Sequence, residues 1–290
     1  EILSARADLD PRIRFVKIPP TGLVGALNYG LSIAQSSLVA RMDADDWMHP
    51  RRLQAQFEGM AERPDCVVLG TRVRTAASDD LTGGMREYLA WQNACVTPLQ
   101  LAADVFLEAP FTHPAVMFRR AQIMAAGGYR SGPFPEDYEL WLRLHANGAR
   151  FAKLSAKLLH WRQSSTSLSR CDPRYSRASF DGVRAAYLSL ELARRQCSRV
   201  AVWGAGRKTR RRVDRLLSHG IEVTAWIDID ARKIGNRLNG VPVVPPVWLR
   251  RARRPSMILV YVATHGARQA IADYLAYSGY VNGDNYLMVG

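Results

Sequence analysis

The sequence predicts an α/β protein, with helices flanking its sheets and a second, smaller parallel-sheet domain at the carboxy-terminal end. The first observation is the apolar run Leu38-Val39-Ala40, which is followed by three carboxylates within four positions. A buried strand of an open α/β sheet places acidic groups at the sheet edge in this way, and ligands bind there. The second observation is the order strand, glycine loop, helix and strand after Cys197. That order is typical of a parallel-sheet unit.

Apolar spacing, glycines and prolines predict the elements in order. Before Cys197 we expect strands at 14–18, 38–42, 66–74, 115–118, 151–154 and 157–162. We expect helices at 25–35, after Pro50 with Leu53, Phe57 and Met60 on one face, at 99–107, 120–126 and 135–147, and from Asp172 to about Gln196. Gly83-Gly84 predicts a loop. In the second part we expect strands at 200–203, 223–227 and 258–263, with helices at 207–219 and up to 278.

Composition limits the classes of function. The chain has 290 residues, enough for two domains, and a formal charge of +14. This charge favours anionic partners such as nucleotide sugars, lipid phosphates or membrane surfaces, although a genome rich in arginine codons would also produce it. The sequence has no nucleic-acid-binding motif, and no apolar run is long enough to span a bilayer. Four scattered cysteines without a CxxC pair predict free thiols.

Two acidic sites carry the chemistry. Asp43 and Asp45 offer hard oxygen ligands that suit Mg²⁺ or Mn²⁺, ions that commonly bind together with a diphosphate. An acidic turn in which Asp46 caps the next helix is the alternative. Glu136 and Asp137 lie in the first turn of a predicted helix, where negative charge is favourable in any case. Together the two sites suit the transfer of an activated phosphate ester, in which a metal neutralises the leaving group and a free carboxylate takes a proton.

Four segments in order then resemble a known family: NYGLSIAQSSLVARMDADDWMHPRRLQ, HPAVMFRR with GGYR, FPEDYELWLRL, and LLHWRQSSTSLSR. They look like the bacterial family 2 inverting glycosyltransferases of the GT-A fold, over about residues 10–170. The resemblance implies a GT-A-type mixed sheet flanked by helices. It also implies a nucleotide-sugar donor (UDP-linked), a saccharide or lipid-linked acceptor, Mn²⁺ or Mg²⁺, and a role in surface polysaccharide or glycoconjugate synthesis.

The resemblance also implies roles for single residues. Asp43-Ala44-Asp45 matches the DxD motif of the family, so Asp45 would be the main metal ligand and Asp43 would face the ribose or the metal. Asp137 would be the general base. The remaining matches are Asn28 near the nucleotide and, on the acceptor side, Glu136, Arg162 and His113.

The family normally begins with a strand–helix–strand unit that holds the nucleobase, and nothing in this sequence matches that unit. We therefore expect a chain that lacks its first nucleotide-binding unit, and a catalytically inactive fragment is one alternative. The resemblance implies a cytoplasmic protein that can contact the inner face of the plasma membrane peripherally.

The carboxy-terminal segment resembles the small Rossmann-like domains of sugar-modifying enzymes. Its candidate phosphate or nucleotide site consists of Gly204, Gly206, Arg207 and Asp228, and Thr209 stands in place of the third glycine of a dinucleotide-binding motif. The expected boundaries are 1–171 for the transferase domain, 172–197 for a linking helix and 198–290 for the Rossmann-like domain. A nucleotide- or NAD(P)-sensing protein that acts through this last domain is the alternative function.

Overall fold

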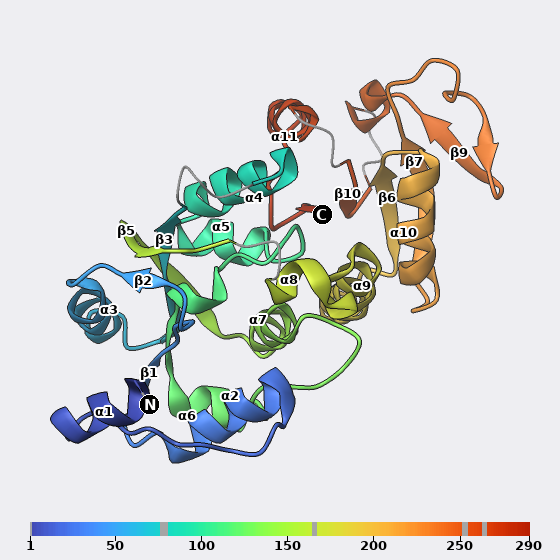
Figure 1. The fold of residues 1–290 in the computed structure, drawn as a ribbon. Coiled ribbons are helices and arrows are strands. Elements are labelled where there is room, and N and C mark those ends of the chain that lie inside the picture. The colour runs from blue at the N-terminus through green and yellow to red at the C-terminus, as the bar shows by residue number, and fades with distance from the viewer. Residues whose placement is uncertain (1, 76–80, 164–166, 251–254, 263–265) are drawn as a thin grey trace.

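The computed structural model describes residues 2–75, 81–163, 167–250, 255–262 and 266–290, which form two sheets with helices around them (Figure 1). The first sheet is mixed and has the strand order β1-β4-β3-β5-β2. Its strands are β1 (Leu38–Ala40), β2 (Trp47–Met48), β3 (Cys66–Arg74), β4 (Met117–Arg119) and β5 (Arg150–His160). β3 and β5 are parallel, and the other pairings are antiparallel.

Helices flank this sheet, as the sequence predicts. They are α1 (Ile2–Leu9), α2 (Gly22–Ile33), α3 (Arg52–Ala61), α4 (Gly83–Ala94), α5 (Pro98–Ala103), α6 (Arg120–Ala125), α7 (Glu136–Ala146) and the 3-10 turn η1 (His113–Ala115). α6 is closed by Gly127 and Gly128, whose N–H groups donate to carbonyls of the helix. Both glycines have a positive φ, which glycine adopts without strain.

The second sheet has the order β11-β10-β6-β7-β9-β8, and all its pairings are parallel except that of β8 with β9. Its strands are β6 (Arg199–Trp203), β7 (Glu222–Ile227), β8 (Arg237–Leu238), β9 (Val241–Val244), β10 (Ile258–Val260) and β11 (Tyr286–Met288). The accompanying helices are α10 (Arg207–Leu217), α11 (Ala267–Tyr277) and the 3-10 turn η3 (Pro246–Arg250). α8 (Leu168–Cys171), η2 (Pro173–Tyr175) and α9 (Arg177–Arg194) connect the two sheets. The predicted α/β fold class is confirmed.

Several predicted elements differ from the structure. Residues 14–18 are extended but pair with no strand among the described residues, so the strand predicted there is wrong. Gly83-Gly84 begins α4 instead of a loop, because Thr82 accepts a hydrogen bond from the Met85 N–H and caps the helix. The two strands predicted at 151–162 are a single strand, β5. The last helix before the second sheet begins at Arg177, since Pro173 opens the short turn η2 instead.

The buried face of α3 is not the apolar one that the spacing predicts. Met60 is fully buried, but the side chains of Leu53 and Phe57 are 45% and 61% exposed. The buried positions belong instead to Arg52 and Gln56, which donate to backbone carbonyls of the sheet and its edge. Polar side chains occupy this interface because they pair with buried backbone carbonyls. Leaving those carbonyls without a hydrogen bond would cost more folding free energy than burying a paired amide or guanidinium.

The second sheet packs directly onto the first part of the molecule. One hydrophobic cluster contains Leu142 of α7, Leu188 of α9 and Val202 of β6. Since this core is continuous, the predicted domain boundaries remain a prediction.

The carboxy-terminal part also holds the loop between α5 and η1. Asn282 donates to the Asp104 carboxylate at 2.8 Å, and the Gly290 N–H donates to the Phe106 carbonyl at 3.2 Å. Arg184 of α9 donates to the Leu107 carbonyl at 3.2 Å. The loop is therefore held both by α9 and by the carboxy-terminal end of the chain.

Met60 and Phe57 of α3 should respond differently to truncation. Met60→Ala should lower the free energy of unfolding by about 2–5 kcal/mol, because it leaves a cavity beneath the sheet. Phe57→Ala should cost less than about 1 kcal/mol, because most of that ring is already in water. Urea denaturation of the two variants measures both values, and equal losses would contradict the placement of α3.

Candidate functional site

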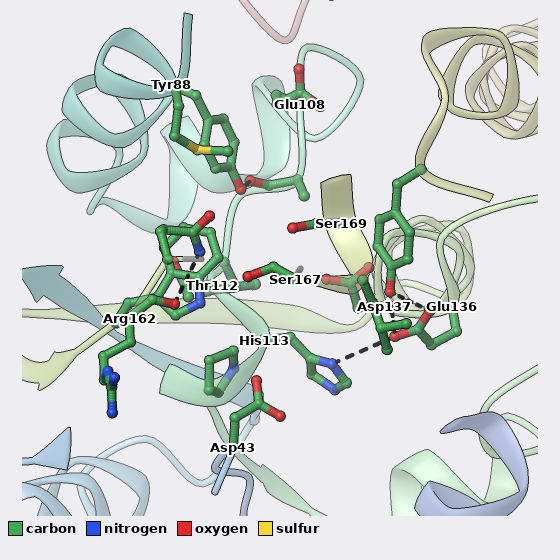
Figure 2. A pocket seen from close by; sticks show the side chains of 18 of the residues that line it. Asp43, Tyr88, Glu108, Thr112, His113, Glu136, Asp137, Arg162, Ser167 and Ser169 are labelled. Carbon is green, nitrogen blue, oxygen red and sulfur yellow. Dashed lines mark hydrogen bonds and ion pairs between the residues drawn. The ribbon is translucent and has the colours of Figure 1, made fainter. Parts of the chain in front are cut away.

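A cavity of about 560 Å³ lies where the end of β1, the start of α7 and the loop after β5 meet. Both acidic sites predicted from the sequence line it, namely Asp43 and Asp45 after β1 and Glu136 and Asp137 at the start of α7. Figure 2 shows Asp43 on one side of the cavity and the pair Glu136 and Asp137 on another. The remaining walls come from α4, the loop before η1 and the segment that leads into α9. Residues that are remote in the sequence thus share one pocket.

The wall that follows β1 combines negative and positive charge. Arg41 forms an ion pair with the Asp43 carboxylate. Asp45 is exposed in the same pocket. Asp45 is therefore the carboxylate of this wall that is most accessible to a ligand.

Asp46 lies beneath that wall and is only 3% exposed. Its Oδ1 accepts the Arg162 N–H at 2.9 Å, and its Oδ2 has no hydrogen-bond partner in the described part of the chain. Burial, reinforced by the negative charges of Asp43 and Asp45, raises the pKa of Asp46 to about 6. Asp46 thus fixes the start of the loop after β5. The alternative interpretation, in which Asp46 caps the next helix, is wrong, since Arg51 precedes α3.

The opposite wall rests on a buried polar cluster. Glu136 is 1% exposed and accepts the Tyr175 hydroxyl at 2.8 and 3.0 Å. His113 Nδ1 lies 4.0 Å from Glu136, and its Nε2 lies 2.7 Å from the Tyr129 hydroxyl. Burial holds the pKa of His113 well below its usual range, so its ring is neutral at pH 7.

Asp137 faces the cavity beside Glu136. Its Oδ1 accepts the Tyr138 N–H at 2.7 Å. Burial and the adjacent Glu136 charge raise the pKa of Asp137, while Arg41 opposes the rise. A carboxylate with a raised pKa is a stronger base than an ordinary aspartate, which suits proton abstraction near neutral pH.

Two other predicted residues occupy different places. Arg162 lines the cavity, and its guanidinium lies 5.8 Å from the centre of the Trp47 ring. Asn28 is not among the cavity residues: its amide donates to the Tyr129 carbonyl and accepts the Tyr129 N–H. Its observed contacts are therefore structural, since they join α2 to the segment after α6.

Sequence reasoning missed several residues of this cavity. Arg41 stands in the acid-bearing segment, and its charge next to three aspartates was a usable signal. Tyr88, Thr112, Tyr175 and Phe180 also line the cavity. No local pattern distinguishes them, because they arrive from separate elements.

The carboxy-terminal candidate site has a different geometry. Gly204 has φ +112° and Gly206 precedes α10, as a phosphate-binding turn requires. Asp228, however, accepts the Ala205 N–H at 2.9 Å and contacts Lys233 Nζ at 3.1 Å. Its carboxylate thus holds the glycine turn in place. Arg207 is exposed at the start of α10.

Residues 1–124 match Glycosyl transferase family 2. The amino-terminal 124 of the 290 residues are therefore similar to this family. This confirms the resemblance drawn from the four sequence segments.

The relatives of this part of the chain include bacterial glycosyltransferases. One is the UDP-Gal:alpha-D-GlcNAc-diphosphoundecaprenol beta-1,3-galactosyltransferase of Escherichia coli, 30% identical over 59% of this chain and 62% of that protein. Another is the amylovoran biosynthesis glycosyltransferase AmsE of Erwinia amylovora, 33% identical over 51% of this chain and 53% of that protein. The chain thus spans between half and two thirds of the length of these two relatives.

Among solved structures, the mannosyltransferase PcManGT from Pyrobaculum calidifontis, in complex with GDP-Man and Mn²⁺, has a TM-score of 0.42. It is 16% identical and covers 67% of this chain and 50% of that one. Within the described ranges, no helix is both long and apolar enough to cross a membrane.

The buried carboxyl group of Asp46 predicts how stability depends on pH. Its pKa is about 6 in the folded chain against 3.8 for a free aspartate, so the folded chain holds an extra proton between these values. Stability should therefore fall as the pH rises through this range. Asp46→Asn should remove the fall and raise the free energy of unfolding at pH 7 by about 1–3 kcal/mol, with little difference from wild type near pH 4.

Denaturant titration in metal-free buffer at several pH values measures this effect. The exposed Asp65, changed to Asn, is the control and should leave the profile unchanged. A profile for Asp46→Asn parallel to wild type would contradict the burial of a charged Asp46.

Proposed function

We propose that this protein transfers a sugar from a nucleotide sugar, UDP-linked, to a hydroxyl group of a saccharide or lipid-linked acceptor, in the synthesis of bacterial surface glycans. The observation that carries the proposal is that Asp43, Asp45 and Asp137 line one cavity. The family 2 match supports the reaction class. The printed functions of the relatives, which include a diphosphoundecaprenol acceptor and amylovoran synthesis, support the class of acceptor.

A divalent ion, Mn²⁺ or Mg²⁺, belongs to this proposal. The described residues contain no cluster of three His, Cys, Asp or Glu side chains that would enclose a metal by themselves. Mg²⁺ commonly takes only one or two protein carboxylates and completes its shell with phosphate oxygens and water. The exposed Asp45, with Asp43 beside it, fits an ion that binds together with a diphosphate. Such an ion would supply positive charge to the diphosphate leaving group.

The side chains then divide the reaction between two walls. The cavity holds donor and acceptor in line, which can contribute roughly 7–11 kcal/mol through orientation alone. Asp137 accepts the proton of the acceptor hydroxyl, whose oxygen forms a bond to the anomeric carbon. The bond from that carbon to the diphosphate oxygen breaks, and its electron pair leaves with the diphosphate. Because attack and departure occur on opposite faces, the anomeric configuration is inverted.

The remaining roles follow from position. Glu136, His113 and Arg162 line the same cavity, and in this proposal they contact the acceptor. A cytoplasmic location with peripheral contact at the inner face of the plasma membrane completes the proposal. The net charge of +14 supports it, since basic proteins are attracted to anionic headgroups.

Removal of the Asp45 carboxylate should weaken nucleotide binding only when metal is present. Asp45→Ala should reduce the affinity for UDP in Mn²⁺ buffer by roughly tenfold or more, because the ion loses its protein ligand. Isothermal titration with UDP, with and without Mn²⁺, measures the change. Asp65→Ala is the matched control at an exposed site, and equal affinities for the Asp45 variant and wild type in Mn²⁺ would refute the metal site.

Removal of the base should separate binding from chemistry. Asp137→Asn should lower the rate of sugar transfer by roughly 10²–10⁴-fold, the usual contribution of a general base, while donor affinity stays within twofold or so of wild type. Nucleoside diphosphate release with an acceptor panel gives the rate, and titration with the donor gives the affinity. Transfer at the wild-type rate would exclude Asp137 as the base.

A further inference from the structure

Tyr175 connects the segment after the transferase sheet to the acid pair. It ends η2, a turn that Asp172 caps by accepting the Arg174 N–H. From there its hydroxyl reaches both oxygens of Glu136, at 2.8 and 3.0 Å, and its side chain lines the cavity. Sequence reasoning assigned no role to this tyrosine.

Glu136 depends strongly on this contact. Its side chain is 1% exposed, and within the described ranges the Tyr175 hydroxyl makes its only side-chain hydrogen bonds. His113 Nδ1, at 4.0 Å, lies beyond hydrogen-bonding distance. A buried carboxylate without a donor is costly to ionise, so the tyrosine is what stabilises a charge at this position.

Neighbouring carboxylates do not titrate independently. When two of them share a site, the better stabilised one ionises first, and its charge makes the other more difficult to ionise. Glu136 and Asp137 are consecutive in the first turn of α7. Burial and the adjacent charge of Glu136 raise the pKa of Asp137.

We propose that Tyr175 is a positioning residue: by donating its hydroxyl to Glu136, it fixes the negative charge on Glu136 and leaves Asp137 as the member of the pair that exchanges a proton. This rests on the proposed function, in which Asp137 takes the proton of the acceptor. The tyrosine itself touches neither of the reacting atoms in that scheme. It acts by deciding which of two adjacent acids is the base.

Other charged and titratable groups also lie near Glu136 and Asp137 and affect their electrostatic environment. Those that face it from neighbouring elements are Arg41 after β1, Tyr88 of α4, His113 of η1, Tyr129 after α6 and Arg174 of η2. Burial raises the pKa of Tyr88, Tyr129 and Tyr175, so these hydroxyls keep their protons near pH 7. Tyr175 therefore remains a donor throughout the range in which the pair titrates.

The test is the titration of Asp137 in the full chain, followed by NMR of carboxyl-¹³C-labelled aspartate and assigned with Asp137→Asn. In Tyr175→Phe, the Glu136 carboxylate loses its hydrogen-bond donor, so a negative charge beside Asp137 becomes less favourable. The titration midpoint of Asp137 should then fall by about one pH unit. An unchanged or raised midpoint overturns the proposal.

Two further variants isolate the cause. Tyr187→Phe is the matched control, since the Tyr187 hydroxyl donates to Glu139 of the same helix at 2.6 Å, away from the cavity residues. It should leave the midpoint of Asp137 unchanged. Glu136→Gln should lower the midpoint by itself, and adding Tyr175→Phe to it should cause no further shift, because the two act through one charge. A further shift in the double variant would show that the tyrosine acts by another route.

The same variants distinguish this proposal from the proposed function. In a working transferase, Tyr175→Phe should move the acidic limb of the rate profile to lower pH and reduce the plateau rate, because the base is weaker. If the NMR midpoints shift as expected but no sugar is transferred by any variant, the role of Tyr175 stands and the proposed function fails. If transfer occurs and the midpoints do not move, the reverse holds.

Discussion

The guanidinium of Arg41 is the charge on which the cavity depends. Its side chain is almost buried, forms an ion pair with Asp43 and contributes to the electrostatics of both acid walls. It favours the charged form of Asp46 and of Asp137, and it disfavours a charged His113. Among the described residues, six carboxylates line or underlie this cavity, and their mutual repulsion favours the uptake of protons. The Arg41 guanidinium thus offsets part of this repulsion at both acidic sites.

The carboxy-terminal sheet contributes to the same cavity from behind. Asn282 and Gly290 bind the loop that follows α5, and Glu108 and Ala109 of that loop line the cavity. The hydrophobic core continues from α7 through α9 into β6. The carboxy-terminal part therefore supports one wall of the cavity through the contacts that it makes with this loop.

Patterns confined to a few consecutive residues were predictable. The acid-bearing segment after β1, the acid pair at the start of α7 and the glycine turn before α10 all lie where the sequence placed them. Each depends on local rules: apolar runs form strands, acids favour helix starts and glycine permits positive φ. The strand expected at 14–18 failed because a strand needs a partner for its hydrogen bonds, and no local signal provides one.

By itself the sequence determined the α/β class, the family resemblance and the identity of the acids, because these are properties of residue type and short spacing. Only the tertiary structure decided which residues meet. It placed Tyr175 on Glu136, the amide of Asn28 on the backbone of Tyr129, and the polar side chains of Arg52 and Gln56 in the interior. The reason is physical: a buried charge or carbonyl requires a partner, and that partner often comes from a remote part of the chain, where spacing carries no information.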